Sequence, residues 1–382
     1  MAINNEQNKL NVPHLRFPEF EGEWEKCKLG ELAVKVGSGS TPKGGNAVYT
    51  TSGHCFVRSQ NVGMGHLILN DIAYIDESTH QKQKSTELRT NDVLLNITGA
   101  SIGRTALATE EINGGNVNQH VCIIRTNSNV EPSYICDYIQ TSKIQKYIQS
   151  LQTGGSREGL NFEQIRSFPI NIPTVEEQVK IAKLLSLINE RIATQSKLIE
   201  KLESLIKGIA QNVIRNNMPN VRLLDCLECS SSTLQESDAC EHGTYPVYGA
   251  NGIVGYLDSY NTEGEAVYII KDGSGVGTVS YVTGKCAATG TLNTLQTKDG
   301  YSLQYLYYML KVFNFEPYKT GMAIPHIYFK DYGKAKVFCP SYTEQLQYAR
   351  LLYAIESKLS IEKNILTNLR LQKQYLLRQM FI

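Results

Sequence analysis

The sequence predicts an α+β fold: two similar globular parts, each of mixed strands and short helices, joined by two long antiparallel coiled-coil helices in an internal pseudo-two-fold repeat. Three observations support this prediction. The second half of the chain repeats the first, each copy contains a segment in which apolar residues recur every 3.5 positions, and short β-branched or aromatic runs bounded by Gly, Asn or Asp precede both segments.

The repeat is clearest where residues 160–202 recur as residues 327–369, at a constant offset of 167. Pro173 matches Pro340, and the pair Glu177 and Gln178 matches Glu344 and Gln345. Weaker matches lie upstream, where residues 99–103 (GASIG) resemble residues 273–277 (GSGVG) and Asn118 faces Asn293. We therefore expect a globular part at 1–173, a long helix at 174–218, a second globular part at 219–340 and a second long helix at 341–382.

Length and charge narrow the possible functions. A chain of 382 residues should form two or three domains, because one hydrophobic core rarely grows beyond roughly 250 to 300 residues. No apolar run approaches the ~20 residues that span a bilayer, and the N-terminus is polar, so we expect a cytoplasmic protein. The net charge is +1, and both globular parts are slightly acidic. Any DNA binding must therefore use local patches or depend on a partner.

The long helices are predicted from a stripe of apolar residues along each of them, which we call its seam. Stepping by four and three residues from Ile181 to Val213, the first helix presents an almost wholly apolar stripe, interrupted at Gln195. The second stripe runs from Tyr348 to Met380 with polar breaks at Glu362 and Lys373. A period of 3.5 residues is typical of a coiled coil. Gln195 and Glu362 either fix the register of the pair or lie at a partly open seam.

Both helices begin with the same signals. Thr174 and Ser341 follow a proline and are suitable N-caps, and Glu177 and Glu344 lie three residues further on, which predicts two capping boxes. Upstream, we expect strands at 93–98, 121–125, 266–270 and 278–282, and helices at 132–150 and 303–313.

No catalytic signature stands out in the sequence. Residues 273–278 (GSGVGT) resemble a phosphate-binding loop, but no Gly-Lys-Ser/Thr follows, and a tight connection between strands is the better interpretation. A zinc site is a minor alternative to buried thiols for the cluster of possible ligands at Cys226, Cys229, Cys240 and His242. The remaining polar loops are rich in Arg, Asn, Gln, Ser and His, which either read base edges and phosphates or tie down loop backbones.

Several strings resemble the specificity subunit of type I restriction-modification enzymes. They are residues 56–62 (FVRSQNV), 92–104 (DVLLNITGASIGR), 118–120 (NQH), 160–162 (LNF), 172–178 (IPTVEEQ) and 339–345 (CPSYTEQ). The resemblance extends from Trp24 to the end of the sequence, and the repeated Pro-x-x-x-Glu-Gln at the start of each long helix is its most specific part. The second globular part is less typical.

The resemblance implies two target recognition domains, each reading half of a split site in double-stranded DNA. It further implies two modification subunits that use S-adenosylmethionine and motor subunits that use ATP and Mg²⁺, so that this chain carries no catalytic, cofactor-binding or metal-binding residues itself. Competing interpretations are an adaptor that binds only proteins and, less favoured, a self-sufficient methyltransferase or nuclease.

The DNA contacts are expected in the polar loops of both globular parts. In the first part the candidates are Arg58, Gln60, Asn61, Arg104, Asn118, Gln119, His120, Ser156 and Arg157. In the second part they are Tyr248, Asn251, Lys271, Ser274, Asn293, His326 and Lys330.

Overall fold

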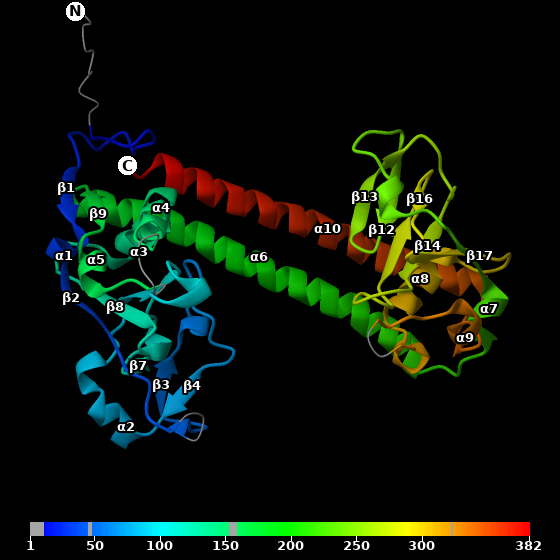
Figure 1. Ribbon diagram of the computed structural model, residues 1–382, viewed down its shortest axis with the longest axis horizontal. Helices are drawn as coiled ribbons and strands as arrows, with labels where there is room; N and C mark the ends of the chain where they lie inside the picture. The colour runs from blue at the N-terminus through cyan, green and yellow to red at the C-terminus, as the bar shows by residue number, and fades with distance from the viewer. Residues whose placement is uncertain (1–10, 45–47, 153–158, 322–323) are drawn as a thin grey trace, which may run out of the picture. The chain divides into compact units, whose positions relative to one another are not determined.

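A computed structural model describes residues 11–44, 48–152, 159–321 and 324–382. The chain divides into two compact units, Met1–Thr194 with Leu366–Ile382 (the first unit) and Gln195–Ile365 (the second unit). Two long helices, α6 (Val175–Arg215) and α10 (Tyr342–Gln379), each contribute residues to both units (Figure 1). The prediction of two long helices is confirmed, with ends that differ from the predicted ones by a few residues.

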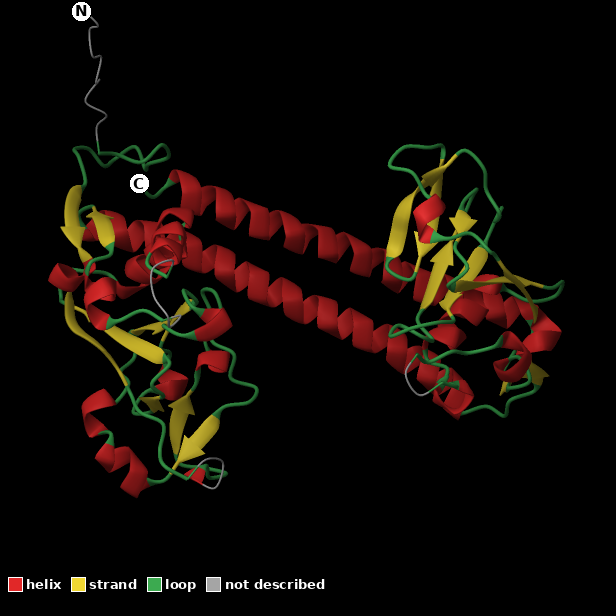
Figure 2. Cartoon of the chain, viewed as in Figure 1, coloured by secondary structure: helices red, strands yellow, loops and turns green. Residues whose placement is uncertain are grey.

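The first unit contains three small sheets (Figure 2). A four-stranded antiparallel sheet has the order β2-β8-β5-β6, and in a three-stranded sheet of order β4-β3-β7 the central strand runs antiparallel to β4 and parallel to β7. A β1-β9 pair lies next to the start of α6. The strands are β1 (Glu25–Lys28), β2 (Ala33–Ser38), β3 (His54–Val57), β4 (Ala73–Ile75), β5 (Val93–Asn96), β6 (Thr105–Leu107), β7 (Asn116–Val117), β8 (Val121–Thr126) and β9 (Pro169–Ile172).

The second unit repeats this topology strand for strand. Its sheets have the orders β11-β17-β14-β15, β13-β12-β16 and β10-β18, with the same parallel and antiparallel pairings. The predicted repeat and the α+β class are therefore confirmed. The strands are β10 (Val221–Arg222), β11 (Leu227–Ser231), β12 (Tyr245–Gly249), β13 (Gly252–Leu257), β14 (Ala266–Ile270), β15 (Val279–Val282), β16 (Ala287–Ala288), β17 (Leu292–Thr297) and β18 (Lys336–Val337).

Strand register confirms one of the two upstream matches and corrects the other. Gly103 N–H donates to Asn96 O, and Gly277 N–H donates to Ile270 O, so the two glycine loops are equivalent. Asn118 is not the counterpart of Asn293. The Asn118 N–H donates to Val57 O on β3, and in the second unit Thr289 N–H makes this bond to Tyr248 O on β12. The second copy is three residues shorter between the glycine loop and this point, which shifts the alignment.

The short helices cover the sheets. The predicted helix at 132–150 is two helices, α3 (Pro132–Gln140) and α4 (Ser142–Ser150), because Thr141 is extended and its side chain caps α4 by accepting from Ile144 N–H. The predicted helix at 303–313 is α8 (Leu303–Lys311), the counterpart of α3. The other short helices are α1 (Leu29–Leu32), α2 (Glu77–Lys82), α5 (Phe162–Arg166), α7 (Leu223–Cys226) and α9 (Phe329–Tyr332).

The seam prediction is confirmed in each unit, because all predicted seam positions are buried or partly buried. In the first unit Ile181 and Leu185 of α6 share a core with Leu376 and Met380 of α10. In the second unit the Gln195 side-chain amide donates to the Glu362 carboxylate at 2.5 Å and to its backbone carbonyl at 3.0 Å. This pair of bonds favours the register-fixing role for the two polar residues.

The repeated Glu-Gln pair has a structural explanation in its glutamine. The Gln178 amide donates to Pro173 O at 2.9 Å and accepts from Glu131 N–H at 2.9 Å, just before α3. Gln345 makes the same two bonds, to Pro340 O and from Ser302 N–H, just before α8. Each amide therefore joins the start of a long helix to the start of the short helix that packs on it.

The two glutamates differ, and one of the predicted capping boxes is wrong. The Glu344 carboxylate accepts from the N–H and the hydroxyl of Ser341, which is the glutamate half of the predicted capping box. Glu177 is fully buried and instead accepts two hydrogen bonds of 2.8 Å from Arg16, a residue 161 positions earlier in the chain. Because this charge is buried, its ion pair takes the place of the cap.

A polar cluster attaches α3 to α10 within the first unit. Gln140 donates to the buried Asp137 carboxylate at 3.0 Å and accepts from Lys373 Nζ at 2.8 Å. Burial raises the pKa of Asp137 to about 7, although Lys373 and Gln140 act in the opposite direction. Burial likewise lowers the pKa of Lys373.

The Asp137→Asn variant should remove a pH dependence of stability. Because the folded state binds this proton more tightly than the unfolded chain, the free energy of unfolding falls as pH rises from about 4 to about 7. Asparagine keeps the acceptor for Gln140 and does not ionise. Thermal unfolding followed by circular dichroism should show the melting temperature of the variant changing less between pH 5 and pH 8 than that of the wild type. Equal pH dependence in the two proteins would contradict this role of Asp137.

Candidate nucleic-acid interface

Three loops of the first unit lie together at the ends of strands. They are residues 58–61 after β3, residues 97–104 between β5 and β6, and residues 118–120 between β7 and β8. Asn96 Nδ2 donates to Ser59 O at 2.8 Å, which joins the first loop to the second. His120 Nδ1 lies 2.5 Å from Thr98 Oγ1, which joins the second to the third. The structure thus brings together most of the candidates predicted in this unit.

Four candidates in these loops make hydrogen bonds within the unit. Asn61 is buried, accepting from Arg58 N–H and donating to Ile68 O, and Asn118 is buried and accepts from His120 N–H. Arg58 and Gln60 both donate to the Asp71 carboxylate, at 3.3 and 2.7 Å. For the two buried asparagines the structure supports the backbone-holding role.

The other candidates of the first unit are more accessible. Arg104 and Gln119 are exposed, and His120 is partly buried. The Gln119 carbonyl accepts from Thr41 N–H at 2.9 Å, and its amide nitrogen lies 3.2 Å from His120 Nε2. Because that ring nitrogen faces a donor, the hydrogen of His120 is on Nδ1, pointing to Thr98. Ser156 and Arg157 lie outside the described residues.

In the second unit, four candidates line one hollow of about 510 Å³: Lys271, Asn293, His326 and Lys330. Asn293 lies at its buried floor, where its amide donates to Tyr332 OH at 3.0 Å and accepts from Ser231 Oγ at 3.2 Å. Of the other candidates, Ser274 and Asn251 are exposed in turns, and the half-buried Tyr248 packs against Tyr268.

Asp272, Ser231 and Tyr328 also line this hollow and were not among the candidates predicted from the sequence. Asp272 Oδ1 lies 2.5 Å from His326 Nδ1. Its position directly after Lys271, in a loop already chosen for its polar residues, was the available signal. The contact with His326 spans 54 residues of sequence, so no local pattern could indicate it.

The possible zinc ligands of the second unit lie on different elements. Cys226 is buried in α7, where its Sγ donates to the Leu223 carbonyl, while Cys229 lies on β11. Cys240 and His242 are exposed near the start of β12. Within the described ranges, no three His, Cys, Asp or Glu residues are grouped to hold a metal ion. The glycine-rich loop at 273–278 connects the antiparallel strands β14 and β15, as predicted.

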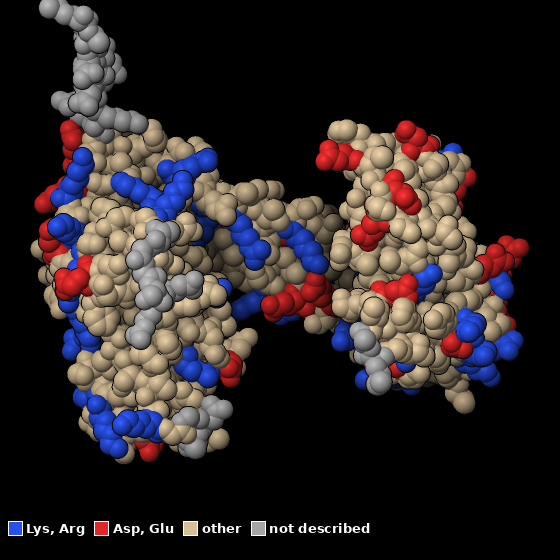
Figure 3. All heavy atoms as spheres, in the orientation of Figure 1, with Lys and Arg blue, Asp and Glu red and all other residues tan. Residues whose placement is uncertain are grey.

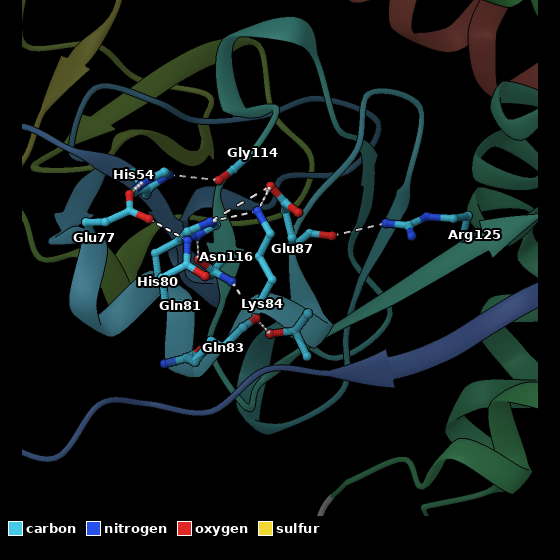
Figure 4. A network of polar contacts seen from close by, with 11 residues as sticks. His54, Glu77, His80, Gln81, Gln83, Lys84, Glu87, Gly114, Asn116 and Arg125 are labelled. Atoms are coloured by element: carbon cyan, nitrogen blue, oxygen red, sulfur yellow. Dashed lines mark hydrogen bonds and ion pairs between the residues drawn. The ribbon is translucent and has the colours of Figure 1, made fainter.

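A second polar network of the first unit surrounds α2 (Figure 4). The rings of His54 and His80 stack with centroids 3.7 Å apart. His54 Nε2 lies 2.7 Å from the Glu77 carboxylate, and His80 Nδ1 lies 2.7 Å from Asn116 Oδ1. Asn116 is buried on β7 and also donates to Gln83 O. The network attaches α2 to the three-stranded sheet, so we assign it to the fold of this unit.

On the side that Figure 3 shows, the Lys and Arg side chains of the described residues do not form a continuous basic face. On the visible side of the second unit, acidic residues gather over the loops around β12 and β13 (Figure 3). Exposed acidic residues of this part include Glu236, Asp238, Glu241 and Asp258. Lys271 and Lys330, by contrast, lie at the hollow. Contact with a polyanion is therefore favoured locally, as the near-neutral composition predicts. No helix in the described part of the chain is long and apolar enough to cross a membrane.

Comparison with known families identifies the family of this chain. A model of the type I restriction modification DNA specificity domain matches residues 21–204 and again residues 217–371. The chain belongs to this family. Its repeat is thus a pair of specificity domains, and type I specificity subunits are non-catalytic.

Individual relatives agree with this assignment. A putative type I specificity subunit of Mycoplasma genitalium is 25% identical over 313 residues, which cover 75% of this chain and 79% of that protein. The EcoprrI specificity subunit of Escherichia coli is 29% identical over 108 residues, or 28% of this chain and 27% of that protein. The crystal structure of a type I S subunit from M. genitalium superimposes with a TM-score of 0.68 at 17% identity, covering 97% of this chain and 99% of that one. This likeness supports the same fold.

Substitutions at Asn293 and Arg104 should separate scaffold residues from surface residues. Asn293→Ala leaves the hydroxyls of Ser231 and Tyr332 without their buried partner, which should cost about 1–3 kcal/mol of unfolding free energy. Arg104→Ala, at an exposed position, should change it by less than about 0.5 kcal/mol. Urea unfolding of the two variants measures the difference. Equal stability losses would show that Asn293 is not a scaffold residue.

Proposed function

We propose that this chain is the DNA-reading subunit of a type I restriction-modification complex, in which each unit reads one half of a bipartite target in double-stranded DNA. One observation carries the proposal. Two units with the same strand order present different polar side chains in equivalent loops, residues 97–104 in the first unit and residues 271–278 in the second. Scaffolds with the same strand order but different loop side chains suit the reading of two different short sequences.

Catalysis in this proposal belongs to partner chains. Two modification subunits would bind S-adenosylmethionine and methylate adenine, and motor subunits would use ATP and Mg²⁺ to translocate and cut DNA. The long helices offer a surface for docking these partners, since their outer faces expose large apolar side chains. These are Leu187, Leu205, Leu351, Tyr353 and Ile361, each about half exposed. Partners that enclose the duplex also explain how a chain of net charge +1 can work on DNA in the cytoplasm.

Two other functions are compatible with a repeat of this kind, and each would give a different result in experiments with DNA. An adaptor that binds only proteins would assemble with the modification subunits but give no sequence preference on DNA. A self-sufficient methyltransferase or nuclease would modify or cleave DNA when purified alone. Neither is favoured by a specific contact in the structure.

Deletion of the gene provides the direct test of sequence reading. Methylome sequencing of the host before and after deletion should show the loss of one adenine-methylated motif made of two short specific parts separated by a non-specific spacer. Restoring the gene should restore the motif. Unchanged methylation after deletion, in cells that express the partner subunits, would reject the proposal.

The lengths of α6 and α10 should set the length of the spacer. Helix α6 has 41 residues and is about 62 Å long at 1.5 Å per residue. Removing one heptad from each helix shortens each by about 10 Å and keeps the seam in phase, which corresponds to ~3 base pairs at 3.4 Å each. The methylome of such a variant should show the same two half-sites with a shorter spacer. A changed half-site with an unchanged spacer would contradict this role of the helices.

A further inference from the structure

The hollow of the second unit contains a carboxylate, that of Asp272. A negative charge is unusual on a surface that we propose to face the phosphates of DNA. Asp272 follows β14, and its side chain is about one third exposed, as is that of His326. Asp272 Oδ1 lies 2.5 Å from His326 Nδ1. Because a carboxylate only accepts, Nδ1 carries the hydrogen. No hydrogen bond from the described residues uses Asp272 Oδ2 or His326 Nε2, so both atoms remain available to a ligand.

Cations on the same hollow offset the charge of this carboxylate. Lys271 Nζ lies 3.4 Å from Ser231 Oγ, and Lys330 Nζ lies 5.3 Å from the centre of the Tyr328 ring. All of these residues line the hollow of about 510 Å³. Repulsion between Asp272 and a DNA backbone is therefore reduced by two ammonium groups that can each approach a phosphate.

The first unit has a different residue at the equivalent position. Asp272 forms an isolated β-bridge with His326, and Thr98 forms the corresponding bridge with Gly159. The neighbouring backbone bonds are also equivalent, since Leu160 N–H donates to Ile97 O and Ile327 N–H donates to Lys271 O, both at 2.9 Å. Thr98 is therefore the counterpart of Asp272.

Both residues contact a histidine, but the histidines come from different loops. His120 belongs to the loop between β7 and β8, whereas His326 precedes α9. The chemical difference at the shared position is large. A threonine hydroxyl can donate or accept, so it tolerates any base edge, whereas an ionised carboxylate accepts only.

We propose that Asp272, positioned by His326, is a specificity-determining residue of the second unit, which reads a base with an amino group on its major-groove edge, cytosine or adenine. In the major groove the N4 of cytosine and the N6 of adenine are donors, while guanine and thymine offer only acceptors on that edge. The carboxylate would therefore reject guanine and thymine on the strand that it faces. This inference rests on the proposed function and adds a residue and a base class to it.

The test uses the methylome of cells that contain the complete system with a variant of this chain. In Asp272→Asn the carboxamide both donates and accepts, and in Asp272→Thr the side chain matches that of Thr98. Both variants should lower the preference for cytosine or adenine at one position of one half-site by about tenfold. The other positions and the other half-site should not change.

Two further variants separate this role from general effects. Asp299→Asn makes the same chemical change in an exposed turn beyond the opposite end of β17, and should leave the motif as in the wild type. Lys330→Ala removes a cation expected at a phosphate, so it should lower methylation at all sites equally without changing the motif.

The results distinguish a failure of the proposed function from a failure of the role proposed for Asp272. If the wild-type chain directs no bipartite motif, the proposed function itself fails. If it does, and both Asp272 variants keep every base preference, the role of Asp272 is rejected. Loss of methylation at every site, by variants that melt at the wild-type temperature, rejects it as well, because the expected effect is confined to one position.

Discussion

Each unit depends on the burial of one apolar stripe from α6 against one from α10, because these stripes complete a core that the small sheets cannot fill alone. In the first unit the residues of this seam join the same core as Ile135 and Ile139 of α3. The amides of Gln178 and Gln345 fix where each long helix begins relative to α3 or α8. The hydrogen bond from Gln195 to Glu362 favours one register of a seam that apolar contacts alone would leave free to slide. A slip of one turn would leave the buried Glu362 carboxylate with Lys358 of its own helix but without its partner across the seam.

The polar loops that we propose to contact DNA are likewise held by buried polar groups. Asn61, Asn118 and Asn293 are buried and satisfy backbone or hydroxyl groups beneath the loops. Their burial places them with the strands as scaffold, while exposed neighbours such as Arg104 and Gln119 remain available to a ligand. A loop held in this way loses little conformational entropy on binding, so more of the contact energy can appear as affinity and as discrimination between bases.

Features with a local or periodic cause were predictable from the sequence. The helix seams follow from a 3.5-residue period and the four predicted strands, β5, β8, β14 and β15, from short β-branched runs. The equivalence of the glycine loops follows from residues 99–103 and 273–277 alone. Features that depend on long-range contacts were not predictable. The role of Glu177 depends on Arg16, the pairing of Asp272 depends on His326, and the false match of Asn118 with Asn293 came from a three-residue difference in a connecting loop. The sequence therefore indicated loops that the structure brings together, but not the long-range partners of their side chains.

The two units combine one backbone arrangement with different loop side chains. The backbone bonds that close the glycine loop are the same in both copies, from Gly103 to Asn96 and from Gly277 to Ile270. The side chains presented there differ, and several of them lie at the surface, where substitutions usually change stability by less than about 0.5 kcal/mol. The buried seam and its amide bonds allow far less change, because each lost partner leaves an unsatisfied group in the core. Side-chain substitutions are therefore tolerated in the loops far more readily than in the buried seam, and the loops are where we propose that the DNA sequence is read.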